Sequence, residues 1–162
     1  MFRTLLPPAI LLLVSLTVAV PAEKYTGPWP PKQDVPYLVH ADTLIETETA
    51  TAKYEDKGNQ RNAWVPGVGS PVRTPLAEPI FLIEVQKLTP EKMELYKFDA
   101  KRERREVTFT LKGGKSASRA LRLTVTRIEG KLYRLEANEG LENGEYSLSQ
   151  DGSDQVFCFQ VY

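Results

Sequence analysis

The sequence predicts an all-β protein that folds as a single antiparallel β-sandwich of seven to nine short strands. Three observations support this prediction. Short runs in which apolar and polar side chains alternate recur after residue 35, as in strands with one buried face. Residues typical of turns separate these runs, and the chain holds 12 Pro and 10 Gly. Hydrophobic residues make up 41% of the 162 positions, which is enough for a packed core.

The N-terminus has the pattern of a signal peptide over residues 1–22. Arg3 supplies a positive charge, the stretch 9–20 has no charged residue, and Val20-Pro21-Ala22 places small or β-branched side chains before a cleavage site. The uncharged stretch is shorter than the about 20 residues that span a bilayer, so we expect cleavage and no stable membrane insertion afterwards. No Cys lies near the cleavage point to carry a lipid. We therefore expect a secreted or periplasmic protein.

A Pro-rich linker is expected at 23–34, because Gly27-Pro28-Trp29-Pro30-Pro31 favours polyproline II over strand or helix. The sandwich domain then covers 35–162. Its first strand is expected within 35–45, where apolar side chains recur at intervals of two or four.

Two longer loops and a central strand are expected next. The stretch 49–62 is polar, and prolines and glycines crowd 64–79, so both are predicted to be irregular. The run 79–85 is apolar on both faces, as in a strand at the centre of a sandwich.

The stretch that follows allows two interpretations. Thr89-Pro90-Glu91 resembles a helix start, and 91–106 is rich in helix formers. However, 101–106 holds no apolar residue, so half of such a helix would bury nothing. We favour one helical turn, then a strand at 92–100 and a charged turn at 101–104. A longer helix stays the alternative.

Hairpins are expected in the C-terminal half. The run 107–111 alternates apolar and polar residues, and 121–137 alternates on both sides of Glu129-Gly130, which is typical of a hairpin. The last two strands are expected at 145–149 and 155–161, joined by a short turn.

The residues before the penultimate strand resemble the tyrosine corner of immunoglobulin-like sandwiches, in which an acidic residue, a small residue and a Tyr recur at alternate positions. Here these are Glu142, Gly144 and Tyr146. The resemblance implies an immunoglobulin-like sandwich in which the Tyr146 hydroxyl bonds to upstream backbone. Leu148 stands where antibody domains have their second Cys, which implies a relative without that disulfide.

Much of the chain resembles an uncharacterised family of small secreted bacterial proteins. The matching stretches are 34–42, 73–79 and 145–162. The resemblance implies an exported bacterial protein with these domain boundaries. It implies no activity and no site residues.

Charge and residue counts exclude several classes of protein. Lys and Arg number 21, as do Asp and Glu, and a chain without net charge lacks the field that holds proteins on nucleic acid. A single Cys and a single His allow no intrachain disulfide and no zinc site built from Cys or several His. We expect no metal, no cofactor and no nucleic-acid partner.

His40, Asp42 and Cys158 form the first candidate site. His40 and Asp42 lie two residues apart in the expected first strand, where they would share a face, and Cys158 stands between two Phe near the C-terminus. A nucleophilic Cys158 would need His40 within hydrogen-bonding reach. We favour an inert core thiol, because aromatic neighbours indicate burial, and we expect no catalytic residue.

The second candidate is a surface for anionic ligands. Basic residues crowd the expected turns at 101–104 and 112–119, where they would gather at one edge and meet anionic polymers or phospholipid headgroups. Alternatively, they are solvated charges that protect a sheet edge from pairing. The residues are Lys101, Arg102, Arg104, Arg105, Lys112 and Lys115.

Together these features predict an exported, non-enzymatic β-sandwich module with a binding or structural role in the cell envelope or outside the cell. Its partner is expected to be an envelope protein or polymer that the sequence does not identify. Two alternatives stay open. One is a secreted enzyme that uses Cys158 with His40, and the other is an adaptor that docks on another envelope protein through 64–79 or a free sheet edge.

Overall fold

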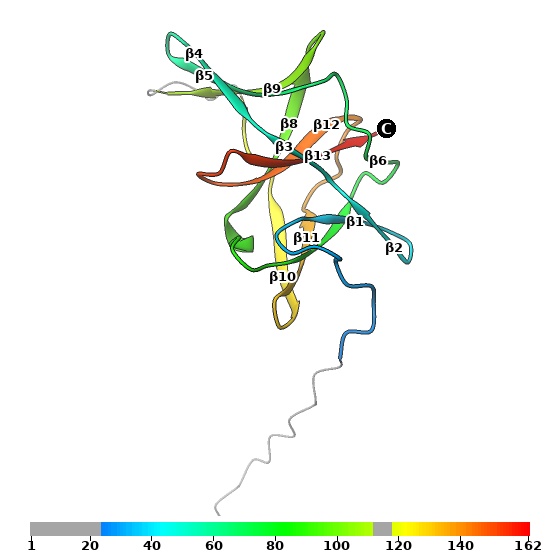
Figure 1. The fold of residues 1–162 in the computed structure, drawn as a ribbon. Helices are drawn as coiled ribbons and strands as arrows, with labels where there is room; N and C mark the ends of the chain where they lie inside the picture. The colour runs from blue at the N-terminus through cyan, green and yellow to red at the C-terminus, as the bar shows by residue number, and fades with distance from the viewer. Residues whose placement is uncertain (1–23, 112–117) are drawn as a thin grey trace, which may run out of the picture.

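Strands form nearly all of the regular structure in the computed structural model, which describes residues 24–111 and 118–162 (Figure 1). The expected signal peptide, and Lys112 and Lys115 of the expected basic patch, lie outside the described residues. The described ranges contain one helical segment, a 3-10 turn at Pro90–Lys92. The strands are β1 (Tyr37–His40), β2 (Thr43–Glu46), β3 (Glu48–Thr51), β4 (Lys53–Lys57), β5 (Gln60–Pro66), β6 (Arg73–Thr74), β7 (Ile80–Glu84), β8 (Met93–Ala100), β9 (Arg104–Thr110), β10 (Leu123–Glu129), β11 (Leu132–Ala137), β12 (Gly144–Gln150) and β13 (Gln155–Val161).

The strands form two sheets that pack face to face, which confirms the predicted all-β sandwich. One sheet has five strands in the order β10-β11-β7-β1-β2. The other follows the path β3-β13-β12-β8-β9-β5-β4, with β6 attached to β13. Paired strands are antiparallel in both sheets, except that β6 runs parallel to β13.

The larger sheet closes on itself, and we call it the closed sheet. β3 and β4 are the two ends of its path, yet only Ala52 separates them along the chain. The stretch 48–57 therefore pairs with β13 at its start and with β5 at its end. Figure 1 shows β12 and β13 between β4, β5 and β9 at the top of the view and β1, β2 and β11 below. The layer in the middle thus has a covered face on each side.

Alternation along β12 and β13 divides the core in two, because successive side chains of a strand point to opposite faces. Tyr146 and Leu148 of β12 and Phe159 of β13 face the five-stranded sheet. There the rings of Phe81 and Phe159 lie 4.9 Å apart between centroids. The residues in between point into the closed sheet. Its buried interior is formed by Ala52, Val65, Phe98, Val107, Val156 and Cys158.

The stretch expected as a single strand at 35–45 is a hairpin. The chain reverses after His40, where Ala41 has a positive φ of 53°, and β1 pairs with β2. The apolar spacing continues across the reversal, which is why the sequence indicates one strand. This is a correction to the prediction.

The stretch expected as a polar loop at 49–62 is mostly strand. β3, β4 and the start of β5 fill it. Its inward positions include the small Ala50 and Ala52, so the alternation carries little apolar signal. The described residues consequently form thirteen strands instead of seven to nine. The closed path also differs from immunoglobulin domains, in which two separate sheets share seven or nine strands.

Other predicted elements are confirmed. β8 makes the stretch after the 3-10 turn a strand and excludes the longer helix. The charged turn at 101–104 is closed by the Lys101 N–H, which donates to the Arg104 carbonyl over 2.8 Å. The β10–β11 hairpin turns at Gly130, whose φ of 52° lies in the left-handed region that glycine adopts without strain.

The segment expected as a linker is tied to the five-stranded sheet. The Tyr25 N–H donates to the Glu129 carboxylate over 3.1 Å. At its other end, the Asp34 carboxylate accepts hydrogen bonds from the backbone N–H groups of 86–88. Burial alone would raise the pKa of Asp34, but these hydrogen bonds and a nearby lysine charge hold it below its usual value. Residues 24–34 therefore belong to the folded unit.

Candidate functional site

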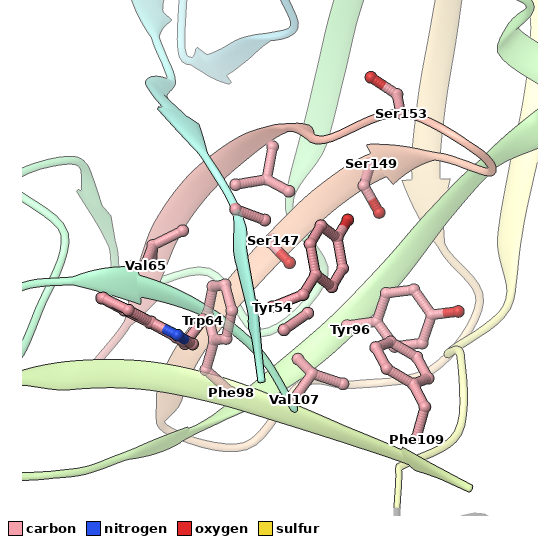
Figure 2. Close-up of a pocket in the computed structure, with 13 residues that line it drawn as sticks. Tyr54, Trp64, Val65, Tyr96, Phe98, Val107, Phe109, Ser147, Ser149 and Ser153 are labelled. Atoms are coloured by element: carbon pink, nitrogen blue, oxygen red, sulfur yellow. The ribbon is translucent and has the colours of Figure 1, made fainter. Parts of the chain in front are cut away.

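A pocket opens from the interior of the closed sheet. Its volume is about 70 Å³, which is room for roughly five water-sized groups at 10–15 Å³ each. Residues of β4, β5, β8, β9, β12 and β13 contribute to its wall (Figure 2). The pocket therefore exists only because the sheet closes.

Aromatic side chains form much of the pocket wall. Tyr96 and Phe109 meet edge to face, with 5.3 Å between ring centroids. Phe98 and Val107 belong to the buried core beneath them. Tyr54 stands at the opening with 47% of its surface exposed, and it lines the pocket together with Ser147 and Ser149 (Figure 2). An apolar group that enters the pocket would contact rings on several sides.

Ser147 places a hydroxyl in this apolar setting. In β12 it alternates with Tyr146 and Leu148, which face the other core, so its side chain lines the pocket. Only 3% of Ser147 is exposed, and no hydrogen bond within the described part of the chain involves its hydroxyl. Its oxygen is not one of the fully enclosed polar atoms that lack a partner, so it is open to the pocket. A molecule bound in the pocket can bond to Ser147 in place of water.

Two shallow hollows continue from the mouth of the pocket, and both share Tyr54 and Ser153 with it. Carboxylates line these hollows: Glu94 and Asp151 in one, and Asp154 in the other. The mouth is therefore both aromatic and acidic.

The phenols at the mouth stay protonated. The Tyr96 hydroxyl donates to the Glu94 carboxylate over 2.8 Å. Burial, and then this carboxylate, raise the pKa of Tyr96. Burial also raises the pKa of Tyr54, with a further contribution from Asp154. Both rings are therefore neutral at any physiological pH, and the Arg61 guanidinium lies over the Tyr54 ring, 6.0 Å from its centroid.

A buried ion pair lies elsewhere in the closed sheet. Arg105 of β9 is fully buried and donates to both carboxylate oxygens of Glu48 over 2.9 Å, and also to the carbonyls of Gly67 and Pro66. A second carboxylate, from Glu145 of β12, lies 3.5 Å away. Every branch of the guanidinium therefore has a partner.

Hydrogen bonds keep the Glu48 carboxylate of this cluster ionised. Burial alone would raise the pKa of Glu48, but the hydrogen bonds from Arg105 and Ser70 hold it below its usual value. The Glu145 carboxylate accepts the Ser70 N–H over 2.9 Å. The cluster thus fastens the loop after β5 to the closed sheet, and its charges are not open to a ligand.

The predicted basic patch needs correction. Arg105 cannot belong to any exposed surface, because it is fully buried. Arg104 pairs with Glu55 over 3.0 Å and with Glu106 over 2.8 Å, so its charge is neutralised. Lys101 lies 3.9 Å from Glu106, and Arg102 is exposed. The register of β9 places Arg104 and Arg105 on opposite faces, which the run of charges in the sequence does not show.

The Cys158 and His40 pair is not brought together. Cys158 is fully buried and points into the closed sheet, whereas His40 is exposed on β1, in the sheet packed on the opposite face. Burial raises the pKa of Cys158 to about 12, although the Arg105 charge partly opposes the shift. His40 and Asp42 do not share a strand face, because the chain reverses between them. The buried-thiol interpretation is confirmed.

The hydrogen bond expected of the tyrosine corner is present. The Tyr146 hydroxyl donates to the Glu142 carbonyl, four residues upstream, over 2.8 Å. The Tyr146 ring is buried and stacks on Phe159 with 5.6 Å between centroids. A Cβ at Gly144 would lie 3.0 Å from the Lys97 side chain, so a larger residue at this position would displace that lysine.

None of the pocket residues stands out from the sequence alone. Most of them come from six strands, and only the closure of the sheet brings them together. One signal exists: Ser147 and Ser149 occupy the inward positions opposite Tyr146 and Leu148 in an otherwise buried strand. Serines at inward positions of a buried strand indicate that a polar group is wanted in the interior, for example to bind a ligand.

Among the residues that the structure describes, no group of three or more His, Cys, Asp or Glu side chains is arranged to hold a metal ion. The same residues include no helix that is long and apolar enough to cross a membrane. Comparisons with protein-family models, curated proteins and solved structures find no match for this chain.

Proposed function

We propose that this protein is an exported, non-enzymatic binding module whose ligand site is the pocket of the closed sheet. The observation that supports the proposal is the unpaired Ser147 hydroxyl, which opens into a pocket with an aromatic wall. Pockets for small molecules combine an apolar lining with a few polar groups that fix orientation. The envelope or the extracellular space is the expected setting, in line with the pattern of residues 1–22.

The size of the pocket limits the ligand. A volume of about 70 Å³ admits only a small group, well below the roughly 300 Å³ at which drug-sized sites begin. The ligand is therefore a small molecule, or a short side group of a larger one whose remainder lies in the hollows at the mouth. The burial and raised pKa of Cys158 support a role without covalent catalysis.

Binding is tested with a neutral probe, 3,3-dimethylbutan-1-ol, titrated into isotope-labelled protein while backbone amide shifts are recorded. We expect saturable shifts in β8 and β12, with weak affinity. Ala52→Leu should abolish them, because Ala52 lines the pocket and is buried. Ser149→Leu blocks the pocket nearer to its mouth and serves if Ala52→Leu folds poorly.

Ala100→Leu is the matched control, since Ala100 is exposed at the end of β8 and lines no part of the pocket. It should leave the shifts unchanged. Shifts that persist in both blocked variants would contradict the proposal, because the probe would then bind elsewhere.

A further inference from the structure

The rim of the pocket carries negative charge without matching positive charge. Glu94, Asp151 and Asp154 line the two hollows, and none of them forms an ion pair with Lys or Arg within the described ranges. The cation that lines a hollow, Arg61, is held by both carboxylate oxygens of Asp56 over 2.8 and 2.9 Å. Its guanidinium also lies over the Tyr54 ring, 6.0 Å from the centroid, so the rings left for a ligand's cation are those of Tyr96 and Phe109. Three carboxylates are thus left to act on whatever occupies the mouth.

Aromatic faces lie beside these carboxylates. Tyr54, Tyr96 and Phe109 line both the pocket and the hollow that holds Glu94 and Asp151. A cation over an aromatic face is attracted by the ring, most strongly where water is excluded. Carboxylates alone attract any cation, but rings favour one whose charge is spread over methyl or methylene groups. The combination selects organic cations over hydrated metal ions.

We infer that the ligand is a small alkylammonium compound whose opposite end carries a hydrogen-bonding group. The ammonium lies at the mouth, between the rings and the three carboxylates. The other end enters the pocket and bonds to the Ser147 hydroxyl, which is 3% exposed and has no partner among the described residues. This inference rests on the proposed function, because it assigns the ligand of the same pocket.

The length of the ligand follows from the same geometry. The pocket holds a group of roughly five heavy atoms, so a two- or three-carbon link places a hydroxyl inside while the ammonium stays outside. Choline has this form and is the first probe. Its neutral counterpart, 3,3-dimethylbutan-1-ol, has a carbon in place of the ammonium nitrogen and the same hydroxyl, so the two probes differ only in charge.

The experiment compares the two probes by amide-shift titration at low and high ionic strength. We expect choline to bind about tenfold more tightly than the neutral alcohol at low salt. The advantage should shrink in 0.5 M NaCl, because salt screens the exposed carboxylates. The affinity of the neutral alcohol should not fall.

Variants separate the contribution of charge from that of the hydroxyl. Glu94→Gln/Asp151→Asn/Asp154→Asn should bring choline down to the affinity of the neutral alcohol. The control Asp42→Asn/Glu78→Gln/Glu139→Gln removes the same number of exposed carboxylates away from the pocket and should preserve the tenfold advantage. Ser147→Ala should weaken both probes by the same factor.

Each outcome has a separate meaning. Equal binding of the two probes in the pocket would overturn the cationic ligand and leave the proposed binding site standing. The cationic ligand is also overturned if the control variant abolishes the advantage as fully as the rim variant does, because a general field would then be responsible. Failure of both probes to bind the pocket would overturn the proposed function as well.

Discussion

The Tyr146 hydroxyl shows how much one atom contributes to this fold. It donates to the Glu142 carbonyl from a buried position, so Tyr146→Phe leaves that acceptor without its partner. We expect the free energy of unfolding to fall by about 1–3 kcal/mol, measured by urea denaturation. Tyr133→Phe is the control, because the Tyr133 hydroxyl has no hydrogen bond among the described residues. Equal losses in both variants would refute a specific role for the corner.

The Cys158 thiol makes stability depend on alkaline pH. Burial raises its pKa in the folded state from 9.0 to about 12, so the unfolded chain releases this proton first as the pH rises. The stabilisation is therefore complete below pH 9 and is lost between pH 9 and 12. Relative to Cys158→Ala, the protein should lose about 1.4 kcal/mol of stability per pH unit above pH 9. Denaturation at pH 8, 9.5 and 10.5 checks this, and parallel pH curves for the two proteins would contradict it.

The Arg105 cluster joins elements that are distant in sequence. It connects β9 to β3, to β12 and to the loop after β5. Arg105→Met leaves the buried Glu145 and the partly buried Glu48 without a counter-charge, so we expect a loss of about 3 kcal/mol. Arg105→Met/Glu48→Met should cost less than the single change, because one stranded carboxylate disappears as well.

Arg104→Met is the matched control for that prediction. Arg104 precedes Arg105 in β9, but it lies on the outward face and is partly exposed. Its loss should cost less than the loss of Arg105, because its partner Glu106 keeps a second cation, Lys101, 3.9 Å away. Chemical denaturation of the three variants gives the comparison. A double variant less stable than Arg105→Met would show that the cluster does not act as an electrostatic unit.

Elements whose strands and turn both carry a local signal are the ones that the sequence predicts correctly. The β10–β11 hairpin has apolar alternation on both sides of Gly130 and appears as expected. The strands at 48–57 are not predicted, because their small inward residues give little apolar alternation. The pocket is not predicted for a different reason: it is created by the pairing of β5 with β9 and of β8 with β12. Long-range pairing of this kind leaves no mark on a local pattern.

Export concerns the whole molecule, and its test is direct. If residues 1–22 are a signal peptide, the mature protein begins at Glu23 and retains the segment from residue 24 that is tied to the five-stranded sheet. Intact-mass analysis of protein from the envelope or culture fluid should give the mass of 23–162. A mass that includes Met1 would contradict cleavage after Ala22.

Because β12 and β13 carry a packed core on each face and hydrogen-bonded neighbours on each side, their amide protons have no route to solvent short of global opening. Hydrogen–deuterium exchange should therefore be slowest in these two strands and report the full free energy of unfolding. β2 and β10 are edge strands and should exchange through local fraying. The C-terminal hairpin would then be the most persistent unit of the fold, with the proposed ligand pocket on one of its faces.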